Sequence, residues 1–194
     1  MRIILASMSK RRSMILSSCG IRHKVIASGA KESLKGRSPS RVVMTNAKFK
    51  AEKVVRAVRS GYIIGADTIC MAGKKIIGKP SNAFHAKRIL QEISGRSISV
   101  YTGLSVIDAK NKRALLGYEK TVIKVKKIKP DEILKYFRLL GPYDKAGGFS
   151  IEGAGSFIFD DIRGSYYNVL GLPTAKLKSM LEELGCNILD IIKI

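Results

Sequence analysis

Short apolar runs rich in β-branched residues alternate along this chain with segments whose apolar residues recur every three or four positions. Residues 3–6 and 62–66 are runs of the first kind, and between them Val43, Ala47 and Ala51 fall on one helical face. Strand and helix patterns continue to intermix along the chain, without an internal repeat or an obvious linker. This order predicts an α/β fold, a mixed twisted sheet with flanking helices, in a single domain of residues 1–194 with two lobes around a central cleft.

The same patterns give bounds for the other elements. Residues 62–66 and 69–71 are predicted as two strands that Asp67 and Thr68 separate, which puts Asp67 at the carboxyl end of the first strand. Ser81 is expected to cap a helix that Gly95 ends. Strands are further predicted at residues 97–109, 113–128, 157–159 and 188–192, and helices at residues 130–139 and 173–184.

The charge balance predicts a polyanionic ligand. The chain carries 36 Lys and Arg against 15 Asp and Glu, a formal net charge of +21. A protein this basic attracts nucleic acid, nucleotides, free phosphates or anionic lipid, and charge alone does not choose among them. A nucleic-acid-binding module without catalysis therefore stays open as an alternative. It is disfavoured because the basic residues are spread over the chain and no nucleic-acid motif is present.

Cysteine and histidine usage excludes several classes of site. The three cysteines are widely spaced and form no Cys-x-x-Cys pair, and the two histidines, His23 and His85, form no zinc-binding pair. The apolar run at residues 3–6 is too short for a signal peptide, and no stretch approaches the ~20 apolar residues that span a bilayer. These features predict a soluble, cytoplasmic protein with reduced thiols and no membrane partner.

A carboxylate at the end of a strand is the best candidate for chemistry. Asp67 is expected at the carboxyl edge of the sheet, where open α/β folds bind ligands, and a carboxylate there can ligate Mg²⁺ or position a water molecule. One such residue is more often structural, and helical lysines such as Lys50 usually face solvent. However, Arg12, Lys50 and Lys79 accompany Asp67, and Glu32 offers a second carboxylate. Cations together with one or two carboxylates are what hydrolysis of a phosphoanhydride requires.

Eight short segments, spread over nearly the whole chain, carry a resemblance. They are Leu5-Ala6-Ser7-Met8-Ser9-Lys10-Arg11-Arg12, Ala47-Lys48-Phe49-Lys50-Ala51, Gly65-Ala66-Asp67-Thr68, Gly78-Lys79-Pro80, Ser94-Gly95-Arg96, Tyr101-Thr102-Gly103, Asp144-Lys145-Ala146-Gly147 and Gly171-Leu172-Pro173. Each segment is unspecific alone, but together and in this order they resemble the Maf family of nucleoside triphosphate pyrophosphatases, also called septum formation proteins.

The resemblance implies a fold akin to the inosine triphosphate pyrophosphatases and a cleft for a nucleoside triphosphate. It implies cleavage between the α- and β-phosphates to a monophosphate and pyrophosphate, with a divalent cation, Mg²⁺ or Mn²⁺, as cofactor. Asp67 matches the family's catalytic aspartate, which activates water or holds the metal, and Glu32 matches a carboxylate that shares the metal. The residues that match phosphate contacts are Ser7, Arg12, Lys50 and Lys79. The resemblance also implies a possible homodimer.

Two positions bear on the choice of nucleotide and point in different directions. Arg12 and Thr68 are similar to the branch of the family that acts on dTTP and UTP. Glu152 stands where that branch carries glutamine, and it is similar instead to the branch that acts on 7-methyl-GTP. A carboxylate only accepts hydrogen bonds, which would favour a base that presents donors. The prediction is dTTP/UTP hydrolysis, a house-cleaning of nucleotide pools, with 7-methyl-GTP as the alternative substrate.

Three residues depart from the family pattern. Lys10 replaces a usual proline, which would preset the start of a helix. Lys31 stands where an acidic residue commonly precedes Glu32, and this puts the metal role of Glu32 in doubt. Ile98 replaces a common histidine.

Overall fold

The structure is a computed structural model that describes residues 2–36, 38–139 and 149–192. Its helices and strands, in chain order, are β1 (Ile3–Leu5), α1 (Lys10–Ser18), β2 (His23–Val25), α2 (Pro39–Val55), β3 (Tyr62–Ala72), β4 (Lys75–Ile77), α3 (Ala83–Ile93), β5 (Ser97–Asp108), β6 (Arg113–Val125), α4 (Pro130–Leu139), the 3₁₀ helix η2 (Gly153–Ile158), β7 (Phe159–Arg163), α5 (Tyr166–Val169), α6 (Thr174–Glu183) and the 3₁₀ helix η3 (Ile188–Asp190).

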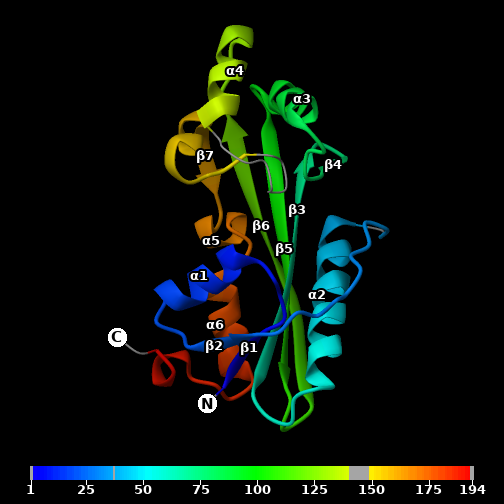
Figure 1. Ribbon diagram of the computed structural model, residues 1–194. Helices are drawn as coiled ribbons and strands as arrows, with labels where there is room; N and C mark the ends of the chain where they lie inside the picture. The colour runs from blue at the N-terminus through cyan, green and yellow to red at the C-terminus, as the bar shows by residue number, and fades with distance from the viewer. Residues whose placement is uncertain (1, 37, 140–148, 193–194) are drawn as a thin grey trace.

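The strands of the described residues form one mixed sheet of seven strands in the order β2-β1-β3-β5-β6-β7, with β4 paired to β3 beside this path. β1 is parallel to β2 and β3, and all other pairs are antiparallel. Helices cover the sheet, and the long strands β3, β5 and β6 run the length of the molecule (Figure 1). The prediction of an α/β fold with a mixed sheet is confirmed.

The edge of β3 that faces away from β5 carries two partners with a gap between them. β1 pairs with β3 at residues 62–64, and β4 pairs with β3 at residues 70–72. β1 and β2 lie at one end of the long strands, beside α1 and α6, whereas β4 lies at the other end with α3 and α4 (Figure 1). We call these two ends of the molecule its lobes, and the stretch of β3 between them, residues 65–69, lies where they meet. Asp67 and Thr68 are in this stretch.

Helix α2 lies unusually close to the sheet because glycine and alanine meet at the contact. A Cβ atom on Gly65 would lie 2.2 Å from the Ala47 carbonyl oxygen, and one on Gly103 would lie 2.3 Å from the Val43 carbonyl oxygen. Ala47 and Ala51 are fully buried on the same side of the helix, as predicted. The close approach brings the polar residues of α2 within reach of the strand that carries Asp67.

The prediction of two strands around Asp67 is wrong. β3 is continuous, because β5 pairs with it over its whole length and matches Asp67 with Gly103 and Thr68 with Thr102. Asp67 nevertheless lies beyond the carboxyl end of β1, whose last residue, Leu5, is level with Ile64. Asp67 therefore lies at an edge of the sheet, as predicted. The edge exists because the neighbouring strand β1 ends before it reaches the level of Asp67, and not because β3 ends there.

Other bounds also differ, among them the end of β6, which is Val125 instead of residue 128. Residues 188–190 form η3 rather than a strand, because the Asn187 side chain accepts a hydrogen bond from the Leu189 N–H and starts a turn. The segment predicted as a strand from residue 157 is helical up to Ile158 and extended only from Phe159, where pairing with β6 begins. The N-cap of α3 is Asn82 instead of Ser81. The predicted motif at residues 144–147 lies outside the described residues. No helix of the described residues is long and apolar enough to cross a membrane.

Candidate active site

Seven of the predicted site residues line one cavity of about 660 Å³ between the lobes. They come from the segment after β1, from α1, from the segment between β2 and α2, from α2 and β3, and from the segment after β4: Ser7, Arg12, Glu32, Lys50, Asp67, Thr68 and Lys79. The same cavity has an apolar side to which Val100, Phe149 and Leu170 contribute. The fold thus brings together side chains that are far apart in the sequence.

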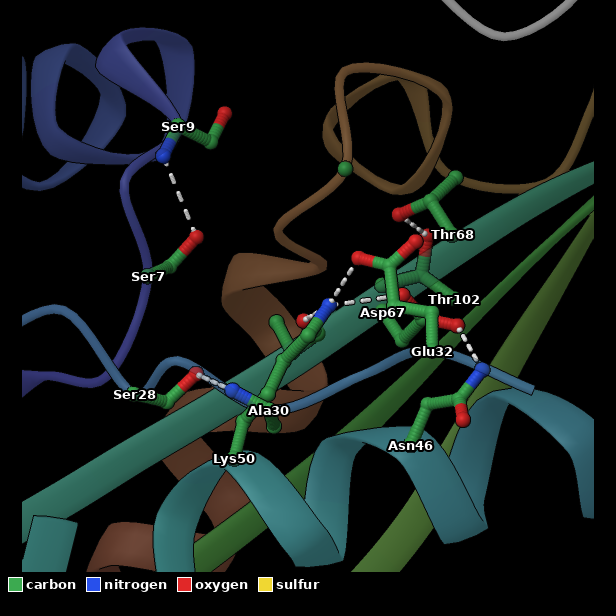
Figure 2. Close-up of polar contacts among 12 residues, drawn as sticks. Ser7, Ser9, Ser28, Ala30, Glu32, Asn46, Lys50, Asp67, Thr68 and Thr102 are labelled. Carbon is green, nitrogen blue, oxygen red and sulfur yellow. Dashed lines mark hydrogen bonds and ion pairs between the residues drawn. The ribbon is translucent and has the colours of Figure 1, made fainter. Parts of the chain in front are cut away.

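Asp67 is buried, and donors hold both of its carboxylate oxygens. The Lys50 ammonium donates to Oδ1 at 2.8 Å, and the Asn46 amide donates to Oδ2 at 2.8 Å. Asn46 is itself held by Ser33, whose N–H donates to Asn46 Oδ1 and whose carbonyl accepts from Asn46 Nδ2, each at 3.0 Å. Figure 2 shows Lys50 and Asn46 reaching from α2 toward Asp67. Two donors fix the plane of the carboxylate.

Lys50 joins the two carboxylates of the cavity. Its ammonium donates to Glu32 Oε1 at 2.7 Å and to the Ala66 carbonyl at 3.2 Å, besides Asp67. The Lys50 side chain is 8% exposed, so the expectation that helical lysines face solvent does not hold here. It does hold for Lys48 and Lys53, which are exposed. We call Lys50, Asp67 and Glu32 the carboxylate cluster.

The pKa of Glu32 is lowered by its cationic neighbours. Partial burial would raise the pKa, but the hydrogen bond and charge of Lys50, with the charges of Arg12 and Lys79, outweigh it. Glu32 is therefore ionised at neutral pH. The influence of Lys79 also indicates that this exposed lysine, which follows β4, contributes positive potential to the cavity.

Arg12 lies on the other side of β3 and is buried, and no carboxylate of the described residues contacts it. Its guanidinium donates from Nε to the Gly171 carbonyl at 2.7 Å, and its two terminal nitrogens donate to Ser7 Oγ at 3.1 Å and Thr68 Oγ1 at 3.0 Å. Burial lowers the pKa of Arg12, against the raising effect of the charges of Asp67 and Glu32, yet arginine stays protonated in proteins. Among the described residues these contacts use three of its five N–H groups, which leaves two that could bind a ligand.

The N-terminus of α1 faces the same cavity. Ser9 is the N-cap and accepts from the Arg12 N–H, and residues 7–12 all line the cavity. Helix N-termini attract anions through free N–H groups and the helix dipole. Glu152 is not among the cavity-lining residues. It is exposed, and its carboxylate lies 3.5 Å from Arg11, which does line the cavity.

The three departures from the family pattern lie in different environments. Lys10 lines the cavity and adds a cation at the start of α1. Lys31 is exposed and is not a lining residue, whereas its neighbour Glu32 is. Ile98 is fully buried in the core and pairs with Ile123 of β6. Of the three changes, Lys10 alone alters the cavity wall.

The sequence patterns assigned no role to Asn46, Thr102 or Gly171, although Thr102 and Gly171 lie in two of the eight segments that carry the family resemblance. Asn46 had a signal, because it stands four residues before Lys50 and beside the inward residues Val43 and Ala47. Two polar residues on the inward side of a helix indicate a polar partner on the sheet. The contact from Arg12 to the Gly171 carbonyl joins residues far apart in sequence, and no local pattern predicts it.

The carboxylates of Asp67 and Glu32 fit a divalent cation that takes its remaining ligands from a bound phosphate compound and from water. The described residues contain no group of three or more His, Cys, Asp and Glu side chains that could hold a metal by themselves. Mg²⁺, however, typically takes one or two carboxylates together with phosphate oxygens and water. The carboxylate cluster sets two carboxylates against one ammonium, so it attracts a cation. Asp67 and Glu32 are the residues that could hold it.

A mixed α/β sheet with a cation-lined cleft and a buried carboxylate defines a protein suited to bind a small polyanion. Residues 2–184 match the family described as Maf-like protein. Among curated relatives, a dTTP/UTP pyrophosphatase from Dictyoglomus thermophilum is 39% identical over 189 residues, 96% of this chain and 98% of the relative. One from Caldicellulosiruptor bescii is 41% identical over 193 residues, 97% of each chain. The chain therefore belongs to the Maf family.

A solved structure supports the fold assignment independently of sequence. The Ham1 protein of Staphylococcus aureus aligns with a TM-score of 0.54 at 12% identity, over 95% of this chain and 100% of that one. At this identity the likeness concerns the fold alone. It confirms the predicted fold class.

Proposed function

We propose that this chain hydrolyses nucleoside triphosphates, dTTP and UTP first, to the monophosphate and pyrophosphate. The observation that carries the proposal is the placement of Asp67: a buried carboxylate held by Lys50 and Asn46 inside a cavity that Arg12 and Lys79 make positive. The names of the relatives from D. thermophilum and C. bescii, both dTTP/UTP pyrophosphatases, support the choice of substrate.

The chain's own groups have separate tasks in this reaction. Arg12, Lys79 and the N-terminus of α1 bind the triphosphate and offset its charge. Asp67 orients a water molecule and takes its proton as the oxygen attacks phosphorus at the α–β anhydride. The bond from that phosphorus to the bridging oxygen breaks, and pyrophosphate leaves. Lys50 holds Asp67 in place throughout.

A divalent cation, Mg²⁺ or Mn²⁺, is part of the proposal. Asp67 and Glu32 would hold it together with phosphate oxygens of the nucleotide. When bound, such a cation neutralises phosphate charge and favours departure of pyrophosphate. The cytoplasmic location and the homodimer stay predictions.

A substrate panel tests the proposal. Purified protein with Mg²⁺ or Mn²⁺ is incubated with dTTP, UTP, CTP, GTP and 7-methyl-GTP, and both products are identified. We expect dTMP or UMP together with pyrophosphate. A nucleoside diphosphate with inorganic phosphate would contradict the predicted bond, and no release from any member of the panel by the folded protein would contradict the function.

One observation supports the alternative substrate, 7-methyl-GTP. Glu152 presents an exposed carboxylate beside the cavity-lining Arg11, at 3.5 Å, and the described residues provide no second ion pair for it. A base that presents donors could use this carboxylate. Faster turnover of 7-methyl-GTP than of dTTP would favour that branch. The alternative of a nucleic-acid-binding module without catalysis is weaker, because Asp67, the predicted catalytic residue, lines the same cavity as six further predicted site residues.

A further inference from the structure

Arg12 is the first link of a buried chain of hydrogen bonds that leads away from the cavity. Its terminal nitrogen donates to Thr68 Oγ1 at 3.0 Å, Thr68 Oγ1 lies 2.9 Å from Thr102 Oγ1, and Thr102 Oγ1 donates to the Asn168 carbonyl at 3.0 Å. Thr102 and Asn168 are completely buried. We call these four groups the hydroxyl chain. Figure 2 shows the link from Thr68 to Thr102.

The direction of each hydrogen bond in the hydroxyl chain follows from the number of protons, because each threonine hydroxyl has one proton to donate. A carbonyl only accepts, so the contact between Thr102 and Asn168 requires the single hydroxyl proton of Thr102. Thr102 then has no proton for Thr68, and Thr68 must donate to Thr102. With its own proton committed inward, Thr68 meets the guanidinium as an acceptor. The protons thus point from Arg12 through Thr68 and Thr102 to Asn168.

The inner end of the hydroxyl chain is firmly anchored. The Asn168 side-chain amide donates to the Val100 carbonyl of β5 at 3.1 Å and to Thr121 Oγ1 of β6 at 2.9 Å. The Asn168 carbonyl also accepts from the Gly171 N–H at 3.0 Å, and the Gly171 carbonyl in turn accepts from Arg12 Nε at 2.7 Å. Two routes of hydrogen bonds therefore lead from Asn168 to the Arg12 guanidinium, one through Thr102 and Thr68 and one through Gly171. Both start at Asn168, whose side chain is hydrogen-bonded to β5 and β6 of the sheet.

We propose that Thr102 is a positioning residue for the phosphate-binding arginine. By taking the Thr68 proton, it makes Thr68 a fixed acceptor, which holds the Arg12 plane so that the two remaining N–H groups face the triphosphate. Thr102 does not touch the substrate. The activity measurements that test this inference rest on the proposed function. The hydrogen-bond geometry from which it is argued does not depend on that function. Links of this kind to a charged group strengthen one another in a buried site.

Thr102→Val and Thr102→Ser test the role. Valine keeps the shape of threonine and removes the hydroxyl, while the Asn168 carbonyl keeps its bond from the Gly171 N–H. Serine keeps the hydroxyl and loses a methyl group. We expect kcat/KM for dTTP to fall about tenfold or more in Thr102→Val, and to stay within about threefold of the original in Thr102→Ser. Equal losses in both variants would indicate a packing role and overturn the proposal.

A double-mutant cycle with Thr68→Val separates positioning from general damage. If Thr102 acts through Thr68, Thr102→Val causes no further loss once Thr68 is valine. Independent, multiplying losses would overturn the proposal, as would full activity in Thr102→Val. The midpoint of thermal unfolding, measured for each variant, verifies that each one is folded.

The same cycle can be measured without catalysis. Affinity for inorganic tripolyphosphate, followed by calorimetry, should show the same coupling between Thr68 and Thr102, because the chain orients a phosphate contact. If the original protein releases no pyrophosphate from any nucleotide, the proposed function fails, while coupled loss of tripolyphosphate binding still supports the role of Thr102. Affinity that Thr102→Val leaves unchanged overturns that role.

Discussion

Two adjacent residues of β3, Asp67 and Thr68, point to opposite faces of the sheet and organise two different kinds of polar site. On the face covered by α2, the carboxylate cluster holds Lys50 between two carboxylates. On the other face, Arg12 is buried among neutral acceptors: the Gly171 carbonyl and two hydroxyls. On the α2 face, the positive charge of Lys50 is compensated by the negative charges of two carboxylates. On the other face, the positive charge of Arg12 is compensated by the dipoles of a carbonyl and two hydroxyls.

The difference determines what each face can attract. Two carboxylates against one ammonium leave the cluster negative, which suits a divalent cation and a polarised water molecule. The described groups in contact with Arg12 are neutral, and Asp67 and Glu32 offset its positive charge from a distance rather than by contact, so the guanidinium can still bind phosphate. A triphosphate with its metal needs both, side by side. The alternation of side chains along one strand supplies this, because residues 67 and 68 must face opposite ways.

The largest effect is expected from removing the charge on the α2 face. Asp67→Asn keeps the shape and the possible bond with Lys50 but loses the base. We expect kcat to fall about a thousandfold, within the range that a general base contributes. The new NH₂ group replaces the oxygen that accepts from Asn46, so the thermal unfolding midpoint should fall slightly while the variant stays folded. Asp108→Asn is the matched control: Asp108 is also buried, but it accepts from Lys110 and Asn111 in a turn far along β5. Near-normal turnover in Asp67→Asn would contradict the mechanism.

On the other face, the shape of the cation matters more than its charge. Arg12→Lys keeps the positive charge but cannot reach three fixed acceptors and still present two N–H groups to phosphate. We expect kcat/KM to fall about a hundredfold, comparable to the loss of one preorganised donor in other enzymes. Arg22→Lys, at an exposed arginine, should leave activity unchanged. Full activity in Arg12→Lys would mean that this face supplies charge alone.

The close packing of α2 can be disturbed without touching a charged group. Gly103→Ala puts a methyl group 2.3 Å from the Val43 carbonyl oxygen, on the face that carries Asp67. The helix must shift outward, and we expect the free energy of unfolding to fall by about 2 kcal/mol, with loss of activity as Lys50 and Asn46 move. Gly78→Ala, where a Cβ meets nothing within 4 Å, should leave the unfolding free energy nearly unchanged. Chemical denaturation measures both.

Much of the α2 face could be predicted from the sequence. The inward stripe of Val43, Ala47 and Ala51 gave the helix and its orientation, and the run before Asp67 gave the strand. The family resemblance singled out Lys50 and Glu32, although it implied a phosphate contact for Lys50, whose ammonium in the structure donates to Asp67 and Glu32. The continuity of β3 could not be predicted, because a polar pair inside an apolar run looks like a strand end. Only the pairing with β5, whose Gly103 and Thr102 lie opposite, keeps the strand extended.

The Arg12 face was much harder to predict. Arg12 itself carried a signal, as part of a basic segment after an apolar run. Its partner Gly171, and Thr102 and Asn168 that it reaches through Thr68, come from distant segments that the folded sheet brings together. Neutral hydroxyls and carbonyls also leave no charge pattern to find. Tertiary hydrogen bonds of this type follow from topology, which local periodicity does not specify.

The smallest effect concerns Glu32, the exposed member of the carboxylate cluster, and it tests whether that cluster works by charge. Because Lys50 and its neighbours lower the pKa of Glu32 below the ordinary value of 4.5, ionised Glu32 stabilises the folded state. This contribution is complete above the ordinary pKa and is lost as the pH falls through the lower, folded value. The Glu32 side chain is 60% exposed, so solvent screening keeps the contribution below about 1 kcal/mol.

Glu32→Gln should therefore be less stable than the original protein at pH 7, and the difference should shrink as the pH falls below 4.5. Denaturant unfolding of both proteins at several pH values measures this difference in unfolding free energy. Effects of the high net charge are common to both proteins, so they cancel in the difference. A difference that persists unchanged at low pH would mean that Glu32 acts through packing, and the contrast between a charge-compensated face and a dipole-compensated face would then rest on Asp67 and Lys50 alone.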